Sequence, residues 1–183
     1  PAHEALNADP MTRYSIGHFK NPRELQKSFE ACAAGDLPQH PPVAMQIPSV
    51  VDPSVAPEGC HIATIYGFYF PCEAPKELRG KLRDEMKERI INRLEQVYPG
   101  LRELILEAAI FSSDHFATMQ GATGGDFTHG LLHADQMLAN RTLVPGSAHR
   151  TPIADLYLCG SSCHPGPGVT FLPGAGCAAE VAT

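Results

Sequence analysis

Six prolines lie between Pro38 and Pro57, and they limit the fold of this chain more strictly than any other sequence feature. Each proline lacks a backbone N–H and fixes its φ angle, so a continuous helix is excluded here and only a short strand, residues 43–47, fits between them. The chain holds 16 Gly and 17 Pro in 183 residues, while 43% of its residues are hydrophobic. This composition excludes a disordered or collagen-like chain and predicts a globular fold rich in turns.

Apolar spacing predicts three further elements in the first half of the chain. A short amphipathic helix is expected within residues 21–32. β-Branched and aromatic residues fill residues 61–70, which is typical of a strand, and Gly67 inside this run indicates a bulge or a close neighbour. Apolar residues recur every three or four positions over residues 75–97 and predict the longest helix.

The second half is more irregular. Residues 105–111 are ambiguous between helix and strand, and we favour a strand, because a strand–helix–strand unit would bury the apolar face of the helix at 75–97. A last strand is expected at 155–159, and an Ala-rich helix from about Pro173. We therefore predict an α+β fold with a mixed or antiparallel sheet covered by helices, followed by the last strand and helix; the sheet strands are 43–47, 61–70 and 105–111.

Charge and cysteine content argue against several classes of protein. The formal net charge is −6, and eight of the 14 basic residues lie between Lys76 and Arg102, where acids alternate with them at helical spacings such as Glu85 with Arg89. This pattern is typical of a solvated helix face, so no nucleic-acid partner is predicted. Six cysteines occur without a CxxC pair, which indicates reduced thiols.

No run approaches the length of about 20 apolar residues that a membrane-spanning helix requires, and the first residues lack the charged-then-apolar layout of a signal peptide. An intracellular, cytoplasmic location is therefore expected. The chain begins with Pro rather than Met and its last residues carry no helix cap, so we also expect it to be a fragment of a longer protein.

The most informative pattern is DLYLCGSSCHPGPGVTFLPGAGCAAEVA, which begins at Asp155. It predicts a short strand that breaks at Gly160, a loop of small residues, and a helix. A helix N-terminus offers free N–H groups to negative charge, and Gly166 and Gly168 have no Cβ, so this loop can lie flat against a planar ring. An ordinary tight connection between a strand and a helix is the alternative interpretation.

The run DLYLCGSSCHPGPGV resembles the C-terminal flavin-binding segment of the phytoene desaturase-like group of FAD-dependent oxidoreductases, part of the amine oxidase superfamily, where a strand LYLxG precedes a loop THPGGGV. Two further runs agree, IPSVVDPSVAPEGCH with a segment of the substrate domain and GGDFTHGLLHADQMLANR with the segment shortly before the last strand. The resemblance implies that residues 1–150 are substrate-domain-like and that 151–183 form the C-terminal FAD-binding strand, loop and helix.

The resemblance also implies FAD as the cofactor and hydride transfer from a C–H bond of an apolar substrate to the flavin. It assigns no catalytic residue. The cofactor-binding residues that it implies are Gly160, Ser161, His164, Gly166, Gly168, Val169 and Thr170. The first two match positions near the pyrophosphate and ribityl part of FAD, and the loop from Gly166 onward matches the flavin ring. Ser161 stands where an acid is frequent in the superfamily.

No GxGxxG follows a strand anywhere in the 183 residues, so the part that would bind the ADP moiety of FAD is missing. We therefore expect this chain alone to bind FAD weakly or not at all and to be inactive. The alternative function is a flavin-free binding or interaction module of the same fold. Substrate identity and electron acceptor stay open.

An apolar small molecule is the expected substrate, and its cavity would be lined by Tyr66, Phe68, Phe70 and His129. Packing into an ordinary hydrophobic core is the alternative for the three aromatic residues. The full-length protein is further expected to associate peripherally with a membrane. This chain, without its partner domain, is expected to form a homodimer that covers its exposed flavin-facing surface.

The sequence also contains residues that could form a metal site or a serine nucleophile. A mixed site of His129, His133, Cys159, Cys163 and His164 lacks the usual zinc spacing, so no metal is predicted. A serine nucleophile at Ser161 or Ser162 lacks the GxSxG elbow. Asp126, close to His129 in the sequence, is expected to cap a loop rather than to form an acid–base pair.

Overall fold

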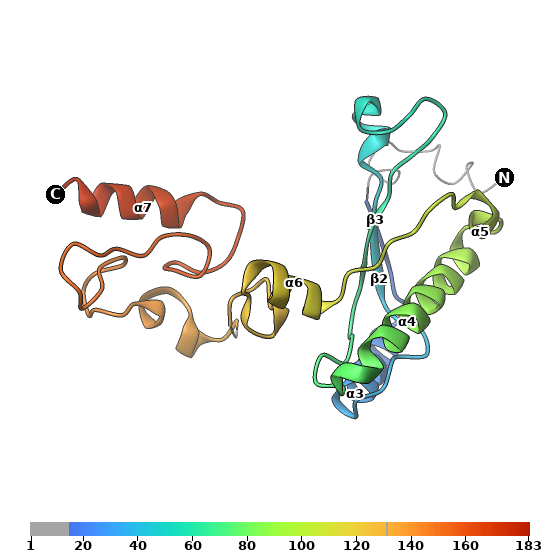
Figure 1. The fold of residues 1–183 in the computed structure, drawn as a ribbon, viewed down its shortest axis with the longest axis horizontal. Helices are drawn as coiled ribbons and strands as arrows, with labels where there is room; N and C mark the ends of the chain where they lie inside the picture. The colour runs from blue at the N-terminus through green and yellow to red at the C-terminus, as the bar shows by residue number, and fades with distance from the viewer. Residues whose placement is uncertain (1–14, 131) are drawn as a thin grey trace. The chain divides into compact units, whose positions relative to one another are not determined.

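The computed structural model describes residues 15–130 and 132–183, so most of the segment on which the signal-peptide expectation rests lies outside it. The chain divides into two compact units, one ending at Ser112 and one running from Ser113 to Thr183. The first contains β1 (Ser15–His18), α3 (Pro22–Ala33), β2 (Val43–Gln46), β3 (Thr64–Gly67), α4 (Lys76–Val97) and α5 (Leu101–Leu104), with the 3-10 turns η1 (Pro48–Val50) and η2 (Pro53–Val55) (Figure 1). The second contains α6 (Ser113–Gln120), α7 (Leu172–Val181) and the 3-10 turns η3 (Thr123–Gly125), η4 (Ala134–Gln136) and η5 (Leu138–Arg141).

The predicted division at residue 150 concerns the roles of the segments in a full-length protein, and it stays a prediction.

The first unit is built on a three-stranded antiparallel sheet in the order β1–β2–β3, which confirms the α+β class. The strand predicted at residues 43–47 is β2, the central strand. Val43 pairs with His18 of β1 on one side and with Gly67 of β3 on the other. β1 was not among the predicted strands.

The strand predicted at residues 61–70 is confirmed, but it is shorter than predicted, since β3 covers only Thr64–Gly67. At its start, Ile62 donates its N–H to the Ser49 hydroxyl over 3.1 Å rather than to a neighbouring strand. Beyond its end, Tyr69 has a φ of 67°, which turns the chain out of the extended conformation.

The core of the first unit lies between β2 and α4. Alternate residues of β2, Val43 and Met45, are buried together with Leu94 and Tyr98, as expected for a strand with one covered face. Met86 is 2% exposed and extends the buried row along α4. The helical periodicity predicted this covering helix, and burial of its apolar stripe stabilises the unit.

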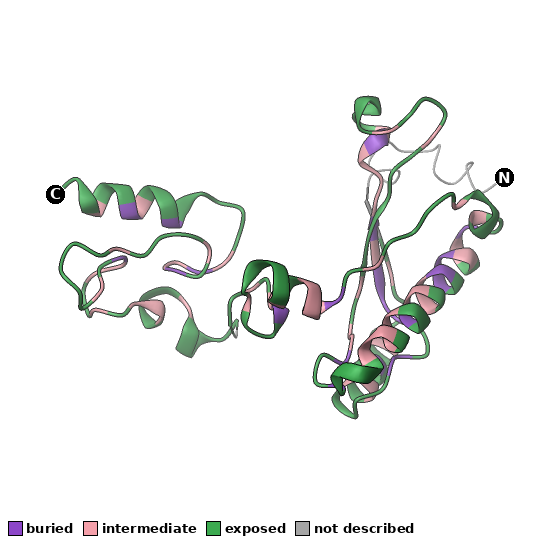
Figure 2. Ribbon diagram, viewed as in Figure 1, coloured by how far each residue is buried: buried purple, intermediate pink, exposed green. Residues whose placement is uncertain are grey.

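Gly67 lies where α4 crosses β3. A Cβ on Gly67 would lie 2.4 Å from Ile90 Cδ1, so the glycine allows the helix to approach the strand closely. The close neighbour predicted for Gly67 is therefore α4. Figure 2 shows buried residues along β2 and on α4, whereas most of the second unit is exposed or half-buried.

Polar contacts attach α3 and the start of the proline-rich segment to α4. The buried Arg93 forms an ion pair with Glu24 of α3. Arg89 donates from Nη1 to the carbonyl oxygens of Leu37 and Pro38, both over 2.8 Å. Backbone donors are scarce in this proline-rich segment, and the side chain of Arg89 supplies hydrogen bonds to two of its carbonyls.

The strand predicted at residues 105–111 is wrong. The helix restarts as α5 after Gly100, because the Glu95 carboxylate accepts the N–H groups of Gly100 and Arg102 over 2.6 and 2.8 Å. Residues 105–111 then continue without a strand partner in the described part of the chain, and Leu106 is exposed. The third place in the sheet is taken by β1 instead.

The regular strand predicted at residues 155–159 is also wrong. Asp155 has a φ of 62°, which places a tight turn at the start of this run, and a single isolated bridge links Arg150 to Tyr157. A strand of this kind needs a sheet to join, and the described residues of the second unit contain none.

The final helix was predicted from about Pro173 and is observed as α7, with Pro173 in its first turn. α6 was not predicted, because its sequence SDHFATMQ is polar and lacks a clear apolar stripe. Across the residues that the structure describes, no helix is long and apolar enough to cross a membrane.

Candidate functional site

The loop that leads into α7 has three glycines in backbone conformations that L-residues rarely adopt. The φ angle is 103° at Gly160, 129° at Gly166 and 150° at Gly168. A Cβ on Gly166 would also lie 3.0 Å from Met137 Cε. The backbone of this loop therefore requires glycine at these three positions.

A distant segment, residues 129–141, holds this loop. Ser161 Oγ and His129 Nε2 are hydrogen-bonded over 2.7 Å, and Leu138 donates its N–H to the Pro165 carbonyl over 3.3 Å. Arg141 also donates to a carbonyl of the loop. The shape of the loop therefore depends on residues that precede it by more than twenty positions.

The end of the loop is exposed and apolar. Val169 is 98% exposed and Phe171 is 85% exposed. Thr170 Oγ1 accepts the N–H of Leu172 over 3.3 Å, whereas Phe171, at the N-cap position of α7, gives no side-chain hydrogen bond to the helix. The positive end of the α7 dipole thus lies beside two uncovered apolar side chains.

His164, the remaining predicted cofactor residue, is half-buried inside the same loop. Its Nδ1 is buried and has no hydrogen-bond partner among the described residues. All seven predicted cofactor-binding positions therefore lie on one continuous loop at the start of α7.

The far end of α7 is anchored by Glu180. Its carboxylate accepts the Ser147 hydroxyl and the N–H of His149, the latter over 3.0 Å, and it pairs with Arg150 over 3.5 Å. The hydrogen bond from Ser147 holds the pKa of Glu180 below its usual range. Gly176 adds a steric contact, because a Cβ there would lie 2.6 Å from His149 Nε2. These contacts fix the position of the helix that follows the loop.

Asp126 closes a turn, as the sequence predicts, and does not extend the Ser161–His129 pair into a triad. One carboxylate oxygen accepts both the N–H and the hydroxyl of Thr128, over 2.8 and 2.6 Å, and the other accepts the N–H of Gly130 over 2.9 Å. The Thr128 hydroxyl is the main reason why the pKa of Asp126 is lowered. The sequence did not predict the serine–histidine pair, because 32 residues separate its members.

The histidines and cysteines considered for a metal site do not gather into one. Within residues 15–130 and 132–183, no group of three His, Cys, Asp or Glu side chains is arranged to hold a metal ion. His133 Nδ1 lies 3.2 Å from the Asp135 carboxylate instead. All six cysteines are free.

Two of the predicted substrate-lining residues are exposed on β3 and beyond it. Tyr66 is 53% exposed and Phe68 is 47% exposed, while Phe70 is half-buried. The core-packing alternative is therefore wrong for Tyr66 and Phe68, because α4 covers the side of the sheet that bears Gly67. His129, the fourth predicted lining residue, belongs to the second unit.

Comparison with known proteins finds relatives among redox enzymes and isomerases. A pyridine nucleotide-disulfide oxidoreductase domain-containing protein 2 from Rattus norvegicus is 33% identical over 150 residues, which is 79% of this chain and 25% of that protein. A lycopene-forming phytoene desaturase from Pseudescherichia vulneris is 30% identical over 129 residues, 67% of this chain and 24% of the desaturase. A chloroplastic prolycopene isomerase from Arabidopsis thaliana is 30% identical over 150 residues, 76% of this chain and 24% of the isomerase.

No family model matches the chain, and no solved structure matches it significantly. The chain spans about a quarter of the length of these curated relatives. The relatives define a class of redox enzymes and isomerases. Within it, the chain is homologous to a segment of the phytoene desaturase-related oxidoreductases, which confirms the resemblance predicted from its motifs.

Proposed function

We propose that this chain is the C-terminal part of an FAD-dependent oxidoreductase, and that residues 160–170 form the edge of its flavin site. One observation carries the proposal: three glycines with left-handed φ angles lie immediately before the exposed start of α7. These glycines occupy the positions at which the motif of the family places its flavin loop. The relatives named as a desaturase and an oxidoreductase support the same class.

The residues present fit the flavin part of FAD. Gly168 presents exposed backbone without a Cβ to a planar ring, and Val169 offers an exposed apolar side chain, whereas Gly166 is buried against Met137. The N-terminal end of α7 carries the partial positive charge of the helix dipole, so it would stabilise negative charge at the flavin edge. Ser161, whose hydroxyl is already bonded to His129, would contact the more polar ribityl part. When bound, FAD supplies the hydride acceptor.

We propose an apolar substrate, in line with the name of the lycopene-forming relative and with the exposed aromatic residues Tyr66 and Phe68. Bound FAD would accept the hydrogen of a substrate C–H bond together with its electron pair, and the proton lost from the neighbouring carbon would pass to water as a double bond forms. Within the second unit, the loop would fix the position of the ring.

The test uses the full-length protein that contains this chain, and it measures the dissociation constant for FAD. Replacing Gly168 by Ala puts a Cβ at a φ of 150°, and a strained backbone of this kind costs about 1–3 kcal/mol. We expect FAD affinity to fall about tenfold. Gly146→Ala is the matched control, because Gly146 also has a positive φ, 82°, but lies outside the loop.

Three results would contradict the proposal. A full-length protein that binds no FAD would favour the flavin-free module. A Gly168→Ala protein that binds FAD as tightly as the wild type, or a Gly146→Ala protein that loses as much affinity, would remove the loop from the flavin site.

A further inference from the structure

Arg141 connects the three pieces of chain that surround the candidate flavin loop. Its Nε donates to the Gln136 carbonyl over 2.7 Å. Its Nη1 donates to the carbonyl of His129 over 3.0 Å and to that of Ser162 over 3.2 Å. One guanidinium therefore ties the turn at residue 129, the η4 turn and the loop itself into one arrangement.

We propose that Arg141 is a positioning residue that fixes the backbone of residues 160–166 for cofactor binding; this rests on the proposed flavin function. The three carbonyls are reached from two nitrogens, Nε and Nη1, whose N–H directions are fixed by the planar guanidinium, whereas a lysine carries all its donors on one nitrogen. A buried arginine nitrogen also remains without a partner here, since Nη2 has no hydrogen bond among the described residues. A buried polar atom without a partner destabilises the fold, so stability does not explain this arginine, and we infer that it serves to shape the loop.

Two neighbours of Arg141 also contact the loop. Met137 packs against Gly166, and Leu138 donates to the Pro165 carbonyl over 3.3 Å. Both residues lie within one helical turn of Arg141, so a displaced arginine would move them together. The loop has few hydrogen bonds of its own, for example from Gly166 N–H to the Cys163 carbonyl over 2.8 Å. Its shape is therefore set largely by residues 136–141.

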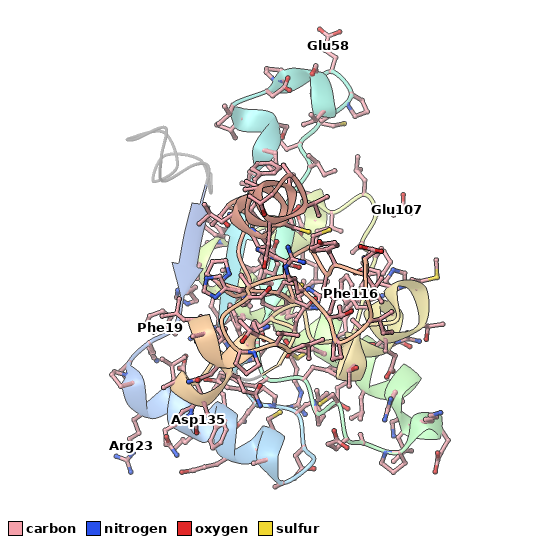
Figure 3. All side chains as sticks on the ribbon, turned by 90° about the vertical axis from the view of Figure 1, so that its left-hand side faces the viewer. Phe19, Arg23, Glu58, Glu107, Phe116 and Asp135 are labelled. Atoms are coloured by element: carbon pink, nitrogen blue, oxygen red, sulfur yellow. The ribbon has the colours of Figure 1, made fainter. Side chains whose placement is uncertain are left out.

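The first part of the test needs no flavin. Hydrogen exchange is measured on the 183-residue chain with Arg141→Met, with Arg141→Lys, and with Arg23→Met as the control. Figure 3 shows Arg23 extending outward from α3, which belongs to the first unit. We expect exchange at the amides of Cys163, Gly166 and Leu138 to rise about tenfold in both Arg141 variants, and to stay at the wild-type rate in Arg23→Met.

Unchanged exchange at these three amides would overturn the proposal, whatever the protein binds. If Arg141→Met abolishes the fold of the second unit, Arg141→Lys, which keeps the charge and the aliphatic stem, decides the matter. Wild-type rates in Arg141→Lys would show that charge alone suffices and would equally overturn it.

The second part uses the full-length protein. We expect Arg141→Lys to bind FAD about tenfold more weakly and to change the visible circular dichroism of the bound flavin, a signature that follows the geometry around the ring. Wild-type affinity and spectrum in Arg141→Lys would overturn the link between Arg141 and the cofactor. If the wild-type protein itself binds no FAD, the proposed function fails, and the exchange result still tests whether Arg141 shapes the loop.

Discussion

Gly174 and Gly176 lie two residues apart in α7, and the structure predicts opposite effects when each is replaced by alanine. Gly176 faces the buried His149, whose Nε2 would lie 2.6 Å from an added Cβ. The ring cannot move away easily, because Nδ1 is hydrogen-bonded to the Leu158 carbonyl over 3.0 Å. Gly174 has no atom within 4 Å of an added Cβ.

The expected magnitudes follow from two effects. Alanine is favoured over glycine within a helix by about 0.5–1 kcal/mol, and this gain applies to both positions. Overpacking at a fixed neighbour costs about 1–3 kcal/mol, and this cost applies only to Gly176. We therefore expect Gly174→Ala to stabilise α7 by up to about 1 kcal/mol and Gly176→Ala to destabilise it by about 0.5–2 kcal/mol.

The assay is native-state hydrogen exchange of the α7 amides in the 183-residue chain, because it reports the opening free energy of this helix rather than that of both units together. If Gly176→Ala is as stable as Gly174→Ala, His149 does not pack against α7 as the structure has it, and the reasoning is refuted.

Further outcomes follow from other contacts. In the first unit, we expect Met86→Ala to lower the free energy of unfolding by about 2–5 kcal/mol in a urea titration, because Met86 is fully buried. Leu78 on the same helix is half-exposed, so Leu78→Ala should lower it by less than about 1 kcal/mol. Equal losses in the two variants would contradict the described core. The pKa of Glu180 is lowered in the folded chain, so its stabilisation of α7 is complete above the ordinary carboxyl pKa and is lost as the pH falls through the lower folded pKa. We therefore expect the protection of the α7 amides from hydrogen exchange to weaken on acidification. Glu180→Gln should make this protection less dependent on pH. The isolated 183-residue chain should bind FAD weakly or not at all, so a purified chain that carries stoichiometric flavin would oppose this expectation. We also expect concentration-dependent sedimentation from dimer formation, and a strict monomer at high concentration would count against it.

Local sequence rules predicted the elements whose stability comes from their own pattern. Apolar periodicity predicted α4, and the spacing of the prolines predicted β2. The proline near the start of α7 predicted where that helix begins. The ion pair in which Arg89 donates to the Glu85 carboxylate also follows from their spacing on α4.

Elements that depend on distant partners could not be predicted in this way. Residues 105–111 are apolar enough for a strand, yet the place beside β2 is filled by β1, which lies far away in sequence. The run 155–159 lacks a sheet to join within the described residues. In the candidate site, the glycines were predictable from the motif, whereas the bonds from His129 and Arg141 to the loop join residues more than twenty positions apart.

The most direct test of the account is hydrogen exchange of the full-length protein with and without FAD, read at residues 160–170 and, as an internal control, at α3. We expect stoichiometric FAD to slow exchange within 160–170, where the backbone would meet the flavin, and to leave α3 unchanged. FAD that binds while exchange at 160–170 stays the same would contradict the central claim.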